Sequence, residues 1–300
     1  MDLTLALDWT PNINHIGFFV ALEQGFYSDR GLTISILDPS SDSYSVTPAK
    51  KVELGAADLA LCPTESLLSY QTKSKPYDLV GIAAVFQHDV SAIVVLGSSG
   101  ISSPKQLDGT TYASYEARYE DEIVRQMIRN AGGEGTITTH YPKKLGIWDT
   151  LVDGTFTSTW IFENWEGVLA LHEGISLTAF RLHDYGIPYS YSPMIVGNKS
   201  AVIRKEHEYR AFLEATRQGY QFAMEHPVAA VDVLKSKVPV HEQNVRLDIA
   251  LERSIPAFGS PEQWGTINPE TVQQFLDWIY DRGLEDQKLT AEQLLHPILN

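Results

Sequence analysis

The residues best suited to hold a ligand near the start of the chain follow its first apolar run, Leu3 to Leu7. That run is typical of a buried strand, and it is followed by Asp8, Trp9, Asn14 and His15. Ligands of open α/β sheets bind beyond the carboxyl ends of strands, near the N-termini of the next helices. A carboxylate, an indole, an amide and an imidazole at such a place indicate a ligand site.

A second group of aromatic and acidic residues spans residues 160–167, Trp-Ile-Phe-Glu-Asn-Trp-Glu-Gly. A predicted strand, Thr159 to Phe162, ends here and a helix begins. Three aromatic rings and two acids in so short a stretch exceed what packing requires. Glu166 suits helix capping, worth about 0.3–1 kcal/mol through the helix dipole, as well as it suits contact with a ligand. Trp160 and Trp165 fit either the core or the wall of a cleft.

Signatures of several other chemistries are missing. The chain has neither a GxGxxG nor a GxxxxGK[ST] phosphate loop, no GxSxG nucleophile elbow and no HExxH metal motif. Cys62 is the only cysteine, which excludes an intrachain disulfide. It stands between a strand and a helix N-terminus, where the pKa of a thiol can fall. The plainer interpretation is a small apolar residue at the end of a strand.

Strands and helices alternate along the first hundred residues, with short links that are typical of a parallel sheet. The predicted strands are Leu3 to Leu7, Leu32 to Leu37, Leu59 to Leu61, Val80 to Phe86 and Ala92 to Leu96. The predicted helices are Ile16 to Tyr27, a segment around Val46 to Leu54, and one that opens at Pro63 to Ser66.

A shift to Ser, Gly and Pro between Gly97 and Gly109 indicates passage into a second lobe. There we expect strands at Thr111 to Tyr115, Thr159 to Phe162 and Leu177 to Leu182, and helices at Tyr119 to Asn130, Ile147 to Val152 and Val168 to His172. The prolines of Gly186 to Pro193 exclude a regular element. Extended structure resumes at Met194 to Val196 and Ala201 to Ile203, followed by helices at Tyr209 to Glu225, Pro227 to Lys237, His241 to Arg253, Thr271 to Arg282 and Ala291 to Leu299.

These elements predict an α/β fold of two lobes with a ligand cleft between them. Lobe I would comprise residues 1–96 and 190–300, with the C-terminal helices packed on it, and lobe II residues 97–189. Each ligand-like cluster would then contribute one side of the cleft.

The charge balance narrows the class of ligand. Lys and Arg number 23 and Asp and Glu 38, a net charge of −15, whereas nucleic-acid-binding proteins show basic patches. We therefore expect no nucleic acid and no anionic membrane as a partner. No apolar run approaches the roughly 20 residues of a membrane-spanning helix. We expect a cytoplasmic protein if Met1 is the native start, and a periplasmic or extracellular one if a leader was removed.

Several motifs together resemble one family. They are Leu-Asp-Trp-Thr-Pro-Asn-x-Asn-His at 7–15, Gly25-Phe26-Tyr27 and Gly55-Ala-Ala-Asp58. This family joins ABC-transporter binding proteins for formylaminopyrimidine, a precursor of the thiamine pyrimidine, with yeast-type thiamine pyrimidine synthases, which make hydroxymethylpyrimidine (HMP) phosphate. The resemblance covers essentially the whole chain and implies the two-lobed periplasmic-binding-protein type II fold. Trp160-Ile-Phe-x-x-Trp-Glu-Gly and Pro188-Tyr-x-Tyr-Ser-Pro193 look like the transporter branch.

The resemblance also implies roles for individual residues. In the binding proteins the pyrimidine stacks between aromatic rings, and a carboxylate meets its amino edge. Trp9 and Phe162 would be the stacking residues and Glu166 the acceptor for the exocyclic amine. Stacking is worth about 0.5–1.5 kcal/mol beyond burial. Asn14, Glu65, Tyr189 and Tyr191 would complete the pocket, and Asp8, His15 and Tyr115 are further ligand-binding candidates, with His15 equally suited to satisfying the turn.

The synthase branch consumes its own active-site histidine together with pyridoxal phosphate held by a lysine. The resemblance places Cys62 and Ser66 at those two positions. The synthase's cysteine-rich stretch is absent at Tyr185 to Ser192, and its phosphate loop corresponds to Tyr115 to Tyr119, which is acidic and bulky. Carboxylates there would repel a phosphate, with Arg118 a partial offset. The known synthase chemistry should therefore be impossible.

We accordingly predict a non-enzymatic binding protein for a thiamine-related aminopyrimidine, with no catalytic residue, cofactor or metal. Its partners would be the small-molecule ligand and, for uptake, an ABC permease; the oligomeric state is left open. The alternative is an intracellular synthase-like enzyme that has lost or altered the pyridoxal-phosphate chemistry. A third option is a receptor for a sulfonate or nitrate, but such anions favour helix N-termini and basic residues over Glu65 and Glu166.

Overall fold

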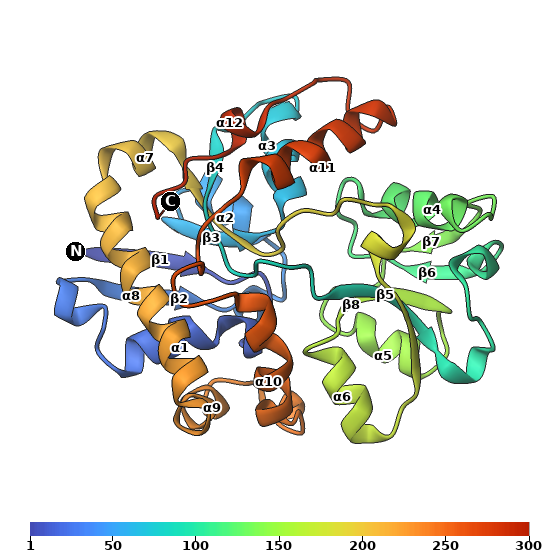
Figure 1. Cartoon of the computed structure of the whole chain (residues 1–300), viewed down its shortest axis with the longest axis horizontal. Helices are drawn as coiled ribbons and strands as arrows, with labels where there is room; N and C mark the ends of the chain where they lie inside the picture. Colours follow the sequence, from blue (N-terminus) through green and yellow to red (C-terminus); the bar gives the residue numbers. More distant parts are fainter. Residues whose placement is uncertain (300) are drawn as a thin grey trace.

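Two five-stranded sheets form the framework of the computed structural model, which describes residues 1–299. Figure 1 shows them in two lobes that lie side by side. The first sheet has the order β2-β1-β3-β10-β4, with β1 at Asp2–Ala6, β2 at Thr33–Leu37, β3 at Leu59–Cys62, β4 at Leu79–Ala84 and β10 at Met194–Asn198. The second has the order β7-β6-β8-β5-β9, with β5 at Ser91–Leu96, β6 at Thr111–Ala113, β7 at Thr138–His140, β8 at Ser158–Phe162 and β9 at Leu177–Phe180.

The two sheets share one topology. In each, a single strand runs against its neighbours: β10 is antiparallel to β3 and β4, and β5 is antiparallel to β8 and β9. The remaining pairs are parallel, as the alternation of strands and helices predicts. Each antiparallel strand is the first to enter its sheet after the chain has crossed from the other lobe. The crossings are residues 85–90 and 181–193.

Helices cover both sheets. The first lobe carries α1 at Ile16–Glu23, α2 at Pro48–Glu53, α3 at Thr64–Thr72, α7 at Lys199–Arg204, α8 at Glu206–Glu225, α9 at Pro227–Lys235, α10 at Leu247–Phe258, α11 at Pro269–Asp281 and α12 at Ala291–Leu294. The second carries α4 at Glu120–Asn130, α5 at Ile147–Val152 and α6 at Glu166–Glu173. Helices α1 and α8 cross with their backbones in contact, because a Cβ on Gly219 would lie only 2.0 Å from the Gly17 carbonyl oxygen.

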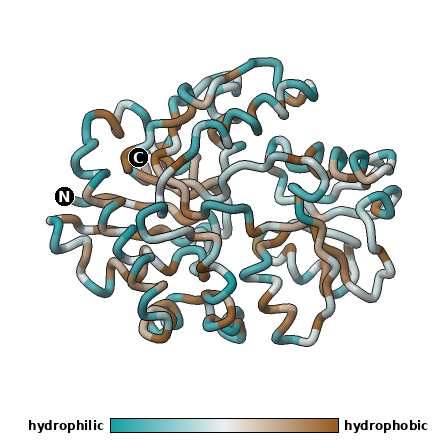
Figure 2. Tube along the Cα trace, viewed as in Figure 1, coloured by the Kyte–Doolittle hydropathy of each residue, from teal (hydrophilic) through white to brown (hydrophobic). Residues whose placement is uncertain are grey.

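The core of the first lobe extends into the second. Trp165 and Val168, at the start of α6, are buried in the same apolar cluster as Ile13 and Phe258 of the first lobe. Figure 2 shows hydrophobic residues along the strands of both lobes and hydrophilic residues on many of the outer loops. The lobes are therefore packed against each other through apolar clusters that they share.

The observed elements confirm the predicted two-lobed α/β class and correct several details. Residues 201–203 form part of α7 and not of a strand, because the Asn198 side chain accepts from the Ala201 N–H and caps a helix there. The last helix ends at Leu294, and Leu295 then bridges to Gly81. Strand β7 was not predicted, because its short Thr-Thr-His sequence lacks an apolar pattern.

The predicted border between the lobes, between residues 96 and 97, does not coincide with the border between the two sheets. Strand β5 pairs with β8 and β9, so residues 91–96 belong to the second sheet. An apolar run predicts a strand but does not say which sheet receives it. We propose to place the lobe borders in the two crossing segments, residues 85–90 and 181–193.

Candidate functional site: a cavity between the lobes

A cavity of about 290 Å³ lies between the two lobes. The first lobe contributes the residues that follow β1 and β3, the first turn of α3 and the segment 44–49. The second lobe contributes residues 115–118, Lys144, the end of β8 and the start of α6. The cavity thus lies at the carboxyl ends of strands in both sheets, where ligands of open α/β sheets bind.

Most of the predicted site residues meet in this cavity. Its lining includes Asp8, Trp9, Asn14, Glu65, Tyr115, Phe162, Glu166 and Tyr189. His15 and Tyr191 are not among the lining residues. Both lie directly behind the wall, where they hold other parts of it in place.

His15 holds the carboxyl group of Asp8. Its side chain is fully buried, and Nε2 lies 2.8 Å from Asp8 Oδ1. Nδ1 accepts from the Asn12 backbone N–H at 3.2 Å. Because Nδ1 accepts, Nε2 of the neutral imidazole carries the proton and donates to Asp8. His15 therefore satisfies the turn, as one of the two sequence interpretations proposed, and positions a carboxylate of the wall.

Tyr191 positions the start of α3. Its carbonyl oxygen accepts from both the backbone N–H and the hydroxyl of Thr64, at 3.0 and 2.9 Å. Its hydroxyl accepts from the Asn268 N–H at 3.0 Å, just before α11. The segment that returns from the second lobe is thereby tied to two helices of the first, and Glu65 follows the anchored Thr64 directly.

Aromatic rings form the walls and meet across the cleft. The Trp9 ring lies 5.6 Å from that of Tyr115 in the opposite lobe, nearly perpendicular at 82°. It also lies 5.7 Å from the Tyr44 ring, with an angle of 52° between the two ring planes. At another part of the lining, Tyr189 lies 5.1 Å from Trp160. A flat apolar ligand would therefore find ring faces or edges on both lobes.

Glu166 lines the cavity from the N-terminus of α6, a helix whose N-cap residue, Trp165, makes no side-chain cap hydrogen bond. Glu166 is the first residue of α6, and its Oε2 accepts from the Phe162 N–H at 3.0 Å. Burial raises the pKa of Glu166 to about 7, although the peptide N–H groups of Glu166 and Phe162 lower it. Near neutral pH this carboxyl group can therefore exist in either form.

Glu65 stands in the first turn of α3 and is only 5% exposed. Its Oε2 has no hydrogen-bond partner within the described part of the chain. Burial raises the pKa of Glu65 to about 8, and the charge of Glu120 adds to the effect. Glu120 itself is fully engaged, since it accepts from the Tyr112 hydroxyl and from the N–H groups of Tyr115 and Ala117.

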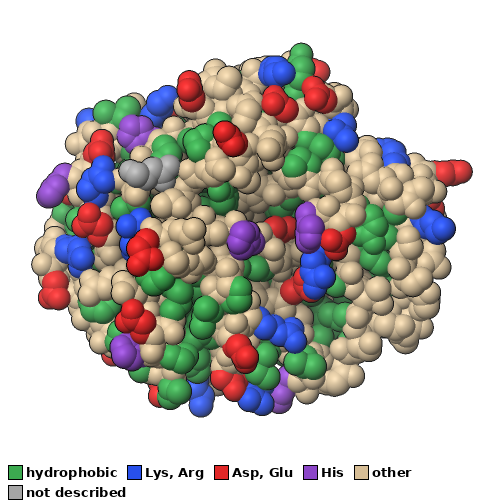
Figure 3. All heavy atoms as spheres, in the orientation of Figure 1, with side chains coloured by type: hydrophobic (Ala, Val, Ile, Leu, Met, Phe, Trp, Pro, Cys, Tyr) green, Lys and Arg blue, Asp and Glu red, His purple; other side chains and the backbone are tan. Residues whose placement is uncertain are grey.

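The lining is acidic. Its carboxyl groups are those of Asp8, Glu65, Glu116, Glu120 and Glu166, and its cations are Arg118 and Lys144. Arg118 is already engaged by Glu285 at 2.8 Å and by the Thr72 hydroxyl at 2.6 Å. Lys144 lies over the Tyr44 ring. On the outer face shown in Figure 3, basic side chains are scattered among acidic ones.

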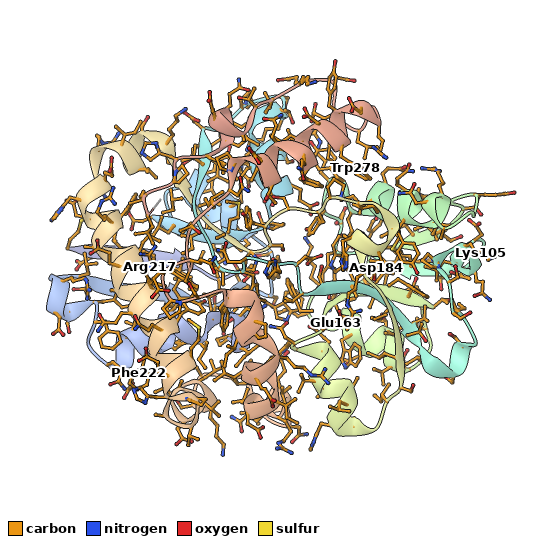
Figure 4. The ribbon with its side chains drawn as sticks, in the orientation of Figure 1. Lys105, Glu163, Asp184, Arg217, Phe222 and Trp278 are labelled. Carbon is orange, nitrogen blue, oxygen red and sulfur yellow. The ribbon has the colours of Figure 1, made fainter. Side chains whose placement is uncertain are left out.

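Direct bonds close the lobes over the cavity. The Asn164 side-chain nitrogen lies 2.8 Å from Asn14 Oδ1 and 2.8 Å from Ser254 Oγ on α10. Elsewhere on the interface, the hydroxyl of Tyr119 donates to Glu285 at 2.7 Å. Figure 4 labels Glu163, the neighbour of Asn164, at the edge of the second lobe that faces the first. Sequence reasoning missed Ser254 and Glu285, because neither stands in a motif and both partners are distant in the chain.

Cys62 and Ser66 lie together in the lining. Burial raises the pKa of the Cys62 thiol well above its ordinary value, which the hydrogen bond with Ser66 only partly offsets. The pKa of the thiol is therefore raised and not lowered at this position, as suits a small buried residue at the end of a strand. Within residues 1–299, no group of three or more His, Cys, Asp or Glu could hold a metal ion. None of the helices described there is both long and apolar enough to cross a membrane.

Sequence comparisons relate the chain to two kinds of protein. The profile of the family described as NMT1/THI5 like matches residues 12–230. A formylaminopyrimidine-binding protein of Halalkalibacterium halodurans is 25% identical over 302 residues, which cover 97% of this chain and 88% of that protein. A 4-amino-5-hydroxymethyl-2-methylpyrimidine phosphate synthase of Legionella pneumophila is 24% identical over 240 residues, which cover 79% of this chain and 74% of the synthase.

Solved structures share the fold at low sequence identity. The alkanesulfonate-binding protein SsuA of Xanthomonas axonopodis pv. citri, bound to MOPS, has a TM-score of 0.74 at 12% identity, over 99% of this chain and 98% of that one. The periplasmic nitrate-binding protein NrtA of Synechocystis PCC 6803 has a TM-score of 0.71 at 13% identity, over 99% and 86%. The fold is thus that of the periplasmic binding proteins, as expected.

Proposed function

Because the chain belongs to the NMT1/THI5-like family, we propose that it binds a thiamine-related aminopyrimidine, of the formylaminopyrimidine or HMP type, for uptake or salvage. The observation that carries this proposal is the cavity between the lobes, with aromatic walls from both sides and buried carboxyl groups in its lining. The formylaminopyrimidine-binding relative, aligned over 97% of the chain, supports the same ligand class.

The chemistry of the cavity suits a small aromatic ring with amino groups. Pockets for small molecules typically begin at about 300 Å³, so a cavity of about 290 Å³ suits a ligand of one ring with short substituents. Trp9 and Phe162 would stack on the ring, and Glu166 would accept from the exocyclic amine. A charge-assisted hydrogen bond of this kind supplies orientation as well as affinity.

The other predicted residues would act around these three. Asn14, Tyr115 and Tyr189 would contact the ligand directly from the cavity wall, together with Glu65. Asp8 would present a carboxylate oriented by His15, which acts as a positioning residue. Tyr191 would act through the N-terminus of α3, because its carbonyl fixes Thr64 next to Glu65.

Small anions do not fit the same lining. Its carboxyl groups outnumber its cations, and Arg118 is neutralised by Glu285. A sulfonate or nitrate would bring further negative charge into a poorly solvated space, which is unfavourable. The chain therefore shares its fold with the sulfonate- and nitrate-binding proteins, and we do not propose that it binds their ligands.

A binding role also fits the chain better than synthase chemistry. Cys62 and Ser66 would replace the lysine and histidine of the synthase branch, and neither can form a Schiff base with an aldehyde cofactor. In the transport setting, the protein would deliver its ligand to an ABC permease from the outer side of the membrane.

Calorimetry tests the proposal. We expect formylaminopyrimidine or HMP to bind with a micromolar or lower Kd, and MOPS and nitrate not to bind. Absence of binding for both pyrimidines up to 1 mM (roughly −4 kcal/mol) would contradict the proposal. To test the enzymatic alternative, the protein is incubated with pyridoxal phosphate and iron, and the intact mass is measured. An unchanged mass and no Schiff-base absorbance are expected, whereas loss of residue mass would favour the synthase-like enzyme.

A further inference from the structure

Glu65 differs from the other buried carboxyl groups of the cavity. Glu120 accepts three hydrogen bonds and Glu166 accepts from peptide N–H groups, so both have donors that stabilise their ionised forms. Glu65 Oε2 is buried and has no partner among the residues described. A buried polar atom without a partner is rare in proteins and requires an explanation. Since Glu65 lines the cavity, a ligand atom is the partner that it lacks.

The surroundings of Glu65 favour its uncharged form. In the part of the chain that is described, no ion pair or hydrogen bond joins a Lys, Arg or His to this carboxyl group. The groups that face it are Glu120 on α4, the Cys62 thiol at the end of β3 and the Tyr189 hydroxyl in the returning segment. Of the two cations of the lining, Arg118 is held by Glu285 and Thr72, and Lys144 lies over the Tyr44 ring. Burial without a counter-charge disfavours ionisation, and the dipole of the short helix α3 opposes this only modestly.

An uncharged carboxylic acid can do what a carboxylate cannot, which is to donate a hydrogen bond. Glu166 accepts peptide N–H groups and would present its remaining acceptor capacity to the ligand from the second lobe. Glu65 would present a donor from the first lobe. The cavity would therefore recognise a ligand with N–H donors on one side and an acceptor atom on the other.

We propose that Glu65 determines specificity by entering the complex as an uncharged carboxylic acid and donating a hydrogen bond from Oε2 to an acceptor of the ligand, a ring nitrogen or a formyl oxygen. This inference rests on the proposed function, because it concerns the same cavity. A ring without an acceptor at that position would leave the acid buried and unpaired, and would be rejected for that reason.

The experiment measures the Kd of HMP and formylaminopyrimidine by calorimetry between pH 6.5 and 9.5. It uses the wild-type protein, Glu65→Gln, Glu65→Met and the matched control Glu173→Gln, an exposed residue at the end of α6. Gln keeps a donor at nearly the same position and cannot ionise, whereas Met offers neither donor nor acceptor. Buffers with different ionisation heats report the protons taken up on binding.

We expect Glu65→Gln to bind within about threefold of wild type at pH 7 and Glu65→Met to bind at least tenfold more weakly, the latter reflecting a lost hydrogen bond. Above about pH 8 the wild-type affinity should fall about tenfold per pH unit and proton uptake should approach one per site, as linkage requires. Glu65→Gln should lack that decline and that uptake. Titration of the ligand itself is common to both proteins and cancels in the comparison.

Other outcomes identify which idea fails. If Glu65→Gln loses tenfold or more at pH 7, or if wild type and Glu65→Gln share one pH profile, Glu65 acts as an ionised acceptor or not at all and this inference is wrong. If the wild type binds neither pyrimidine at any pH, the proposed function itself fails. Thermal unfolding at pH 7 checks each variant, and if Glu65→Met does not fold, the wild-type and Glu65→Gln profiles still decide.

Discussion

The side-chain amide of Asn164 in the second lobe donates to Oδ1 of Asn14 in the first, 2.8 Å away and 150 residues earlier in the chain. The same nitrogen contacts the Ser254 hydroxyl on α10. Asn14 also lines the cavity, so one contact links the ligand site to closure of the lobes. Closure of this kind selects ligands by burying them between two walls.

Removing the hydrogen bond between Asn164 and Asn14 should favour a form in which the two lobes are further apart. In Asn164→Ala, Asn14 Oδ1 loses its donor, and we expect ligand affinity to fall about tenfold, or about 1.4 kcal/mol. Small-angle scattering of the unliganded variant should give a larger radius of gyration than wild type. Asn130→Ala, which removes a 2.6 Å bond to the Tyr185 carbonyl away from the cavity, is the control. Wild-type affinity and radius in Asn164→Ala would argue against a role in closure.

Trp9 should supply much of the binding energy. Trp9→Ala removes a ring that lines the cavity and meets Tyr115 across the cleft, so we expect a loss of at least about thirtyfold in affinity, on the order of 2 kcal/mol. Calorimetry measures this directly, and ligand-induced quenching of tryptophan fluorescence should diminish. Trp148→Ala serves as the control, because Trp148 packs in a separate cluster of the second lobe. Equal losses in both variants would indicate general damage to the fold.

The affinity for the pyrimidine ligand should also fall as the pH drops below about 7. Burial raises the pKa of Glu166 to about 7, so below that pH the group becomes protonated and no longer serves as an acceptor for a ligand amine. We expect Glu166→Gln to bind at least tenfold more weakly than wild type at pH 7.5 and to lose the acid-side decline. The control is Glu163→Gln, whose carboxylate pairs with Arg181 at the surface. A wild-type affinity that stays constant from pH 8 to pH 6 would refute this role of Glu166.

The free energy of unfolding of the unliganded protein should fall with rising pH because of Glu65. Its folded-state pKa of about 8 lies above the value of 4.5 expected for the unfolded chain. The favourable contribution of the protonated group is therefore complete below pH 4.5 and is lost as the pH rises through 8. Relative to wild type, Glu65→Gln should gain about 2–3 kcal/mol in the free energy of unfolding between pH 6 and pH 9. Urea unfolding at both values checks this, and a pH-independent difference would count against a neutral Glu65.

Cys62 should be chemically inert in the native protein. Burial raises the pKa of its thiol, so little thiolate is present at pH 8 and reagents reach it poorly. Alkylation by iodoacetamide, followed by intact mass, should be slow in the native state and fast in guanidinium. A pyrimidine bound in the cavity should slow the alkylation further, since Cys62 lines the cavity. Rapid native labelling would restore the case for a reactive thiol.

Local patterns predicted where two parts of the cavity lining lie. The residues after β1 and the block at 160–167 stand next to short apolar strands, so their place at strand ends could be deduced before any contact was known. Contacts between residues far apart in the chain could not be deduced, because the sequence around Ser254 or Glu285 does not indicate which residues they contact. For the same reason, the apolar run of β5 predicted a strand but not the sheet that it joins, which is the second. The error at residues 201–203 arose because Ala-Val-Ile suits a strand, while the cap at Asn198 decides for a helix.

The position of β10 has a consequence for the order in which the molecule can be made. This strand lies between β3 and β4 and is hydrogen-bonded to both, yet it is synthesised only after every strand of the second sheet. The second sheet is one continuous stretch of chain, and such units fold as they leave the ribosome. The first sheet must wait with a gap between β3 and β4. The lobe that begins the protein is therefore the one completed last.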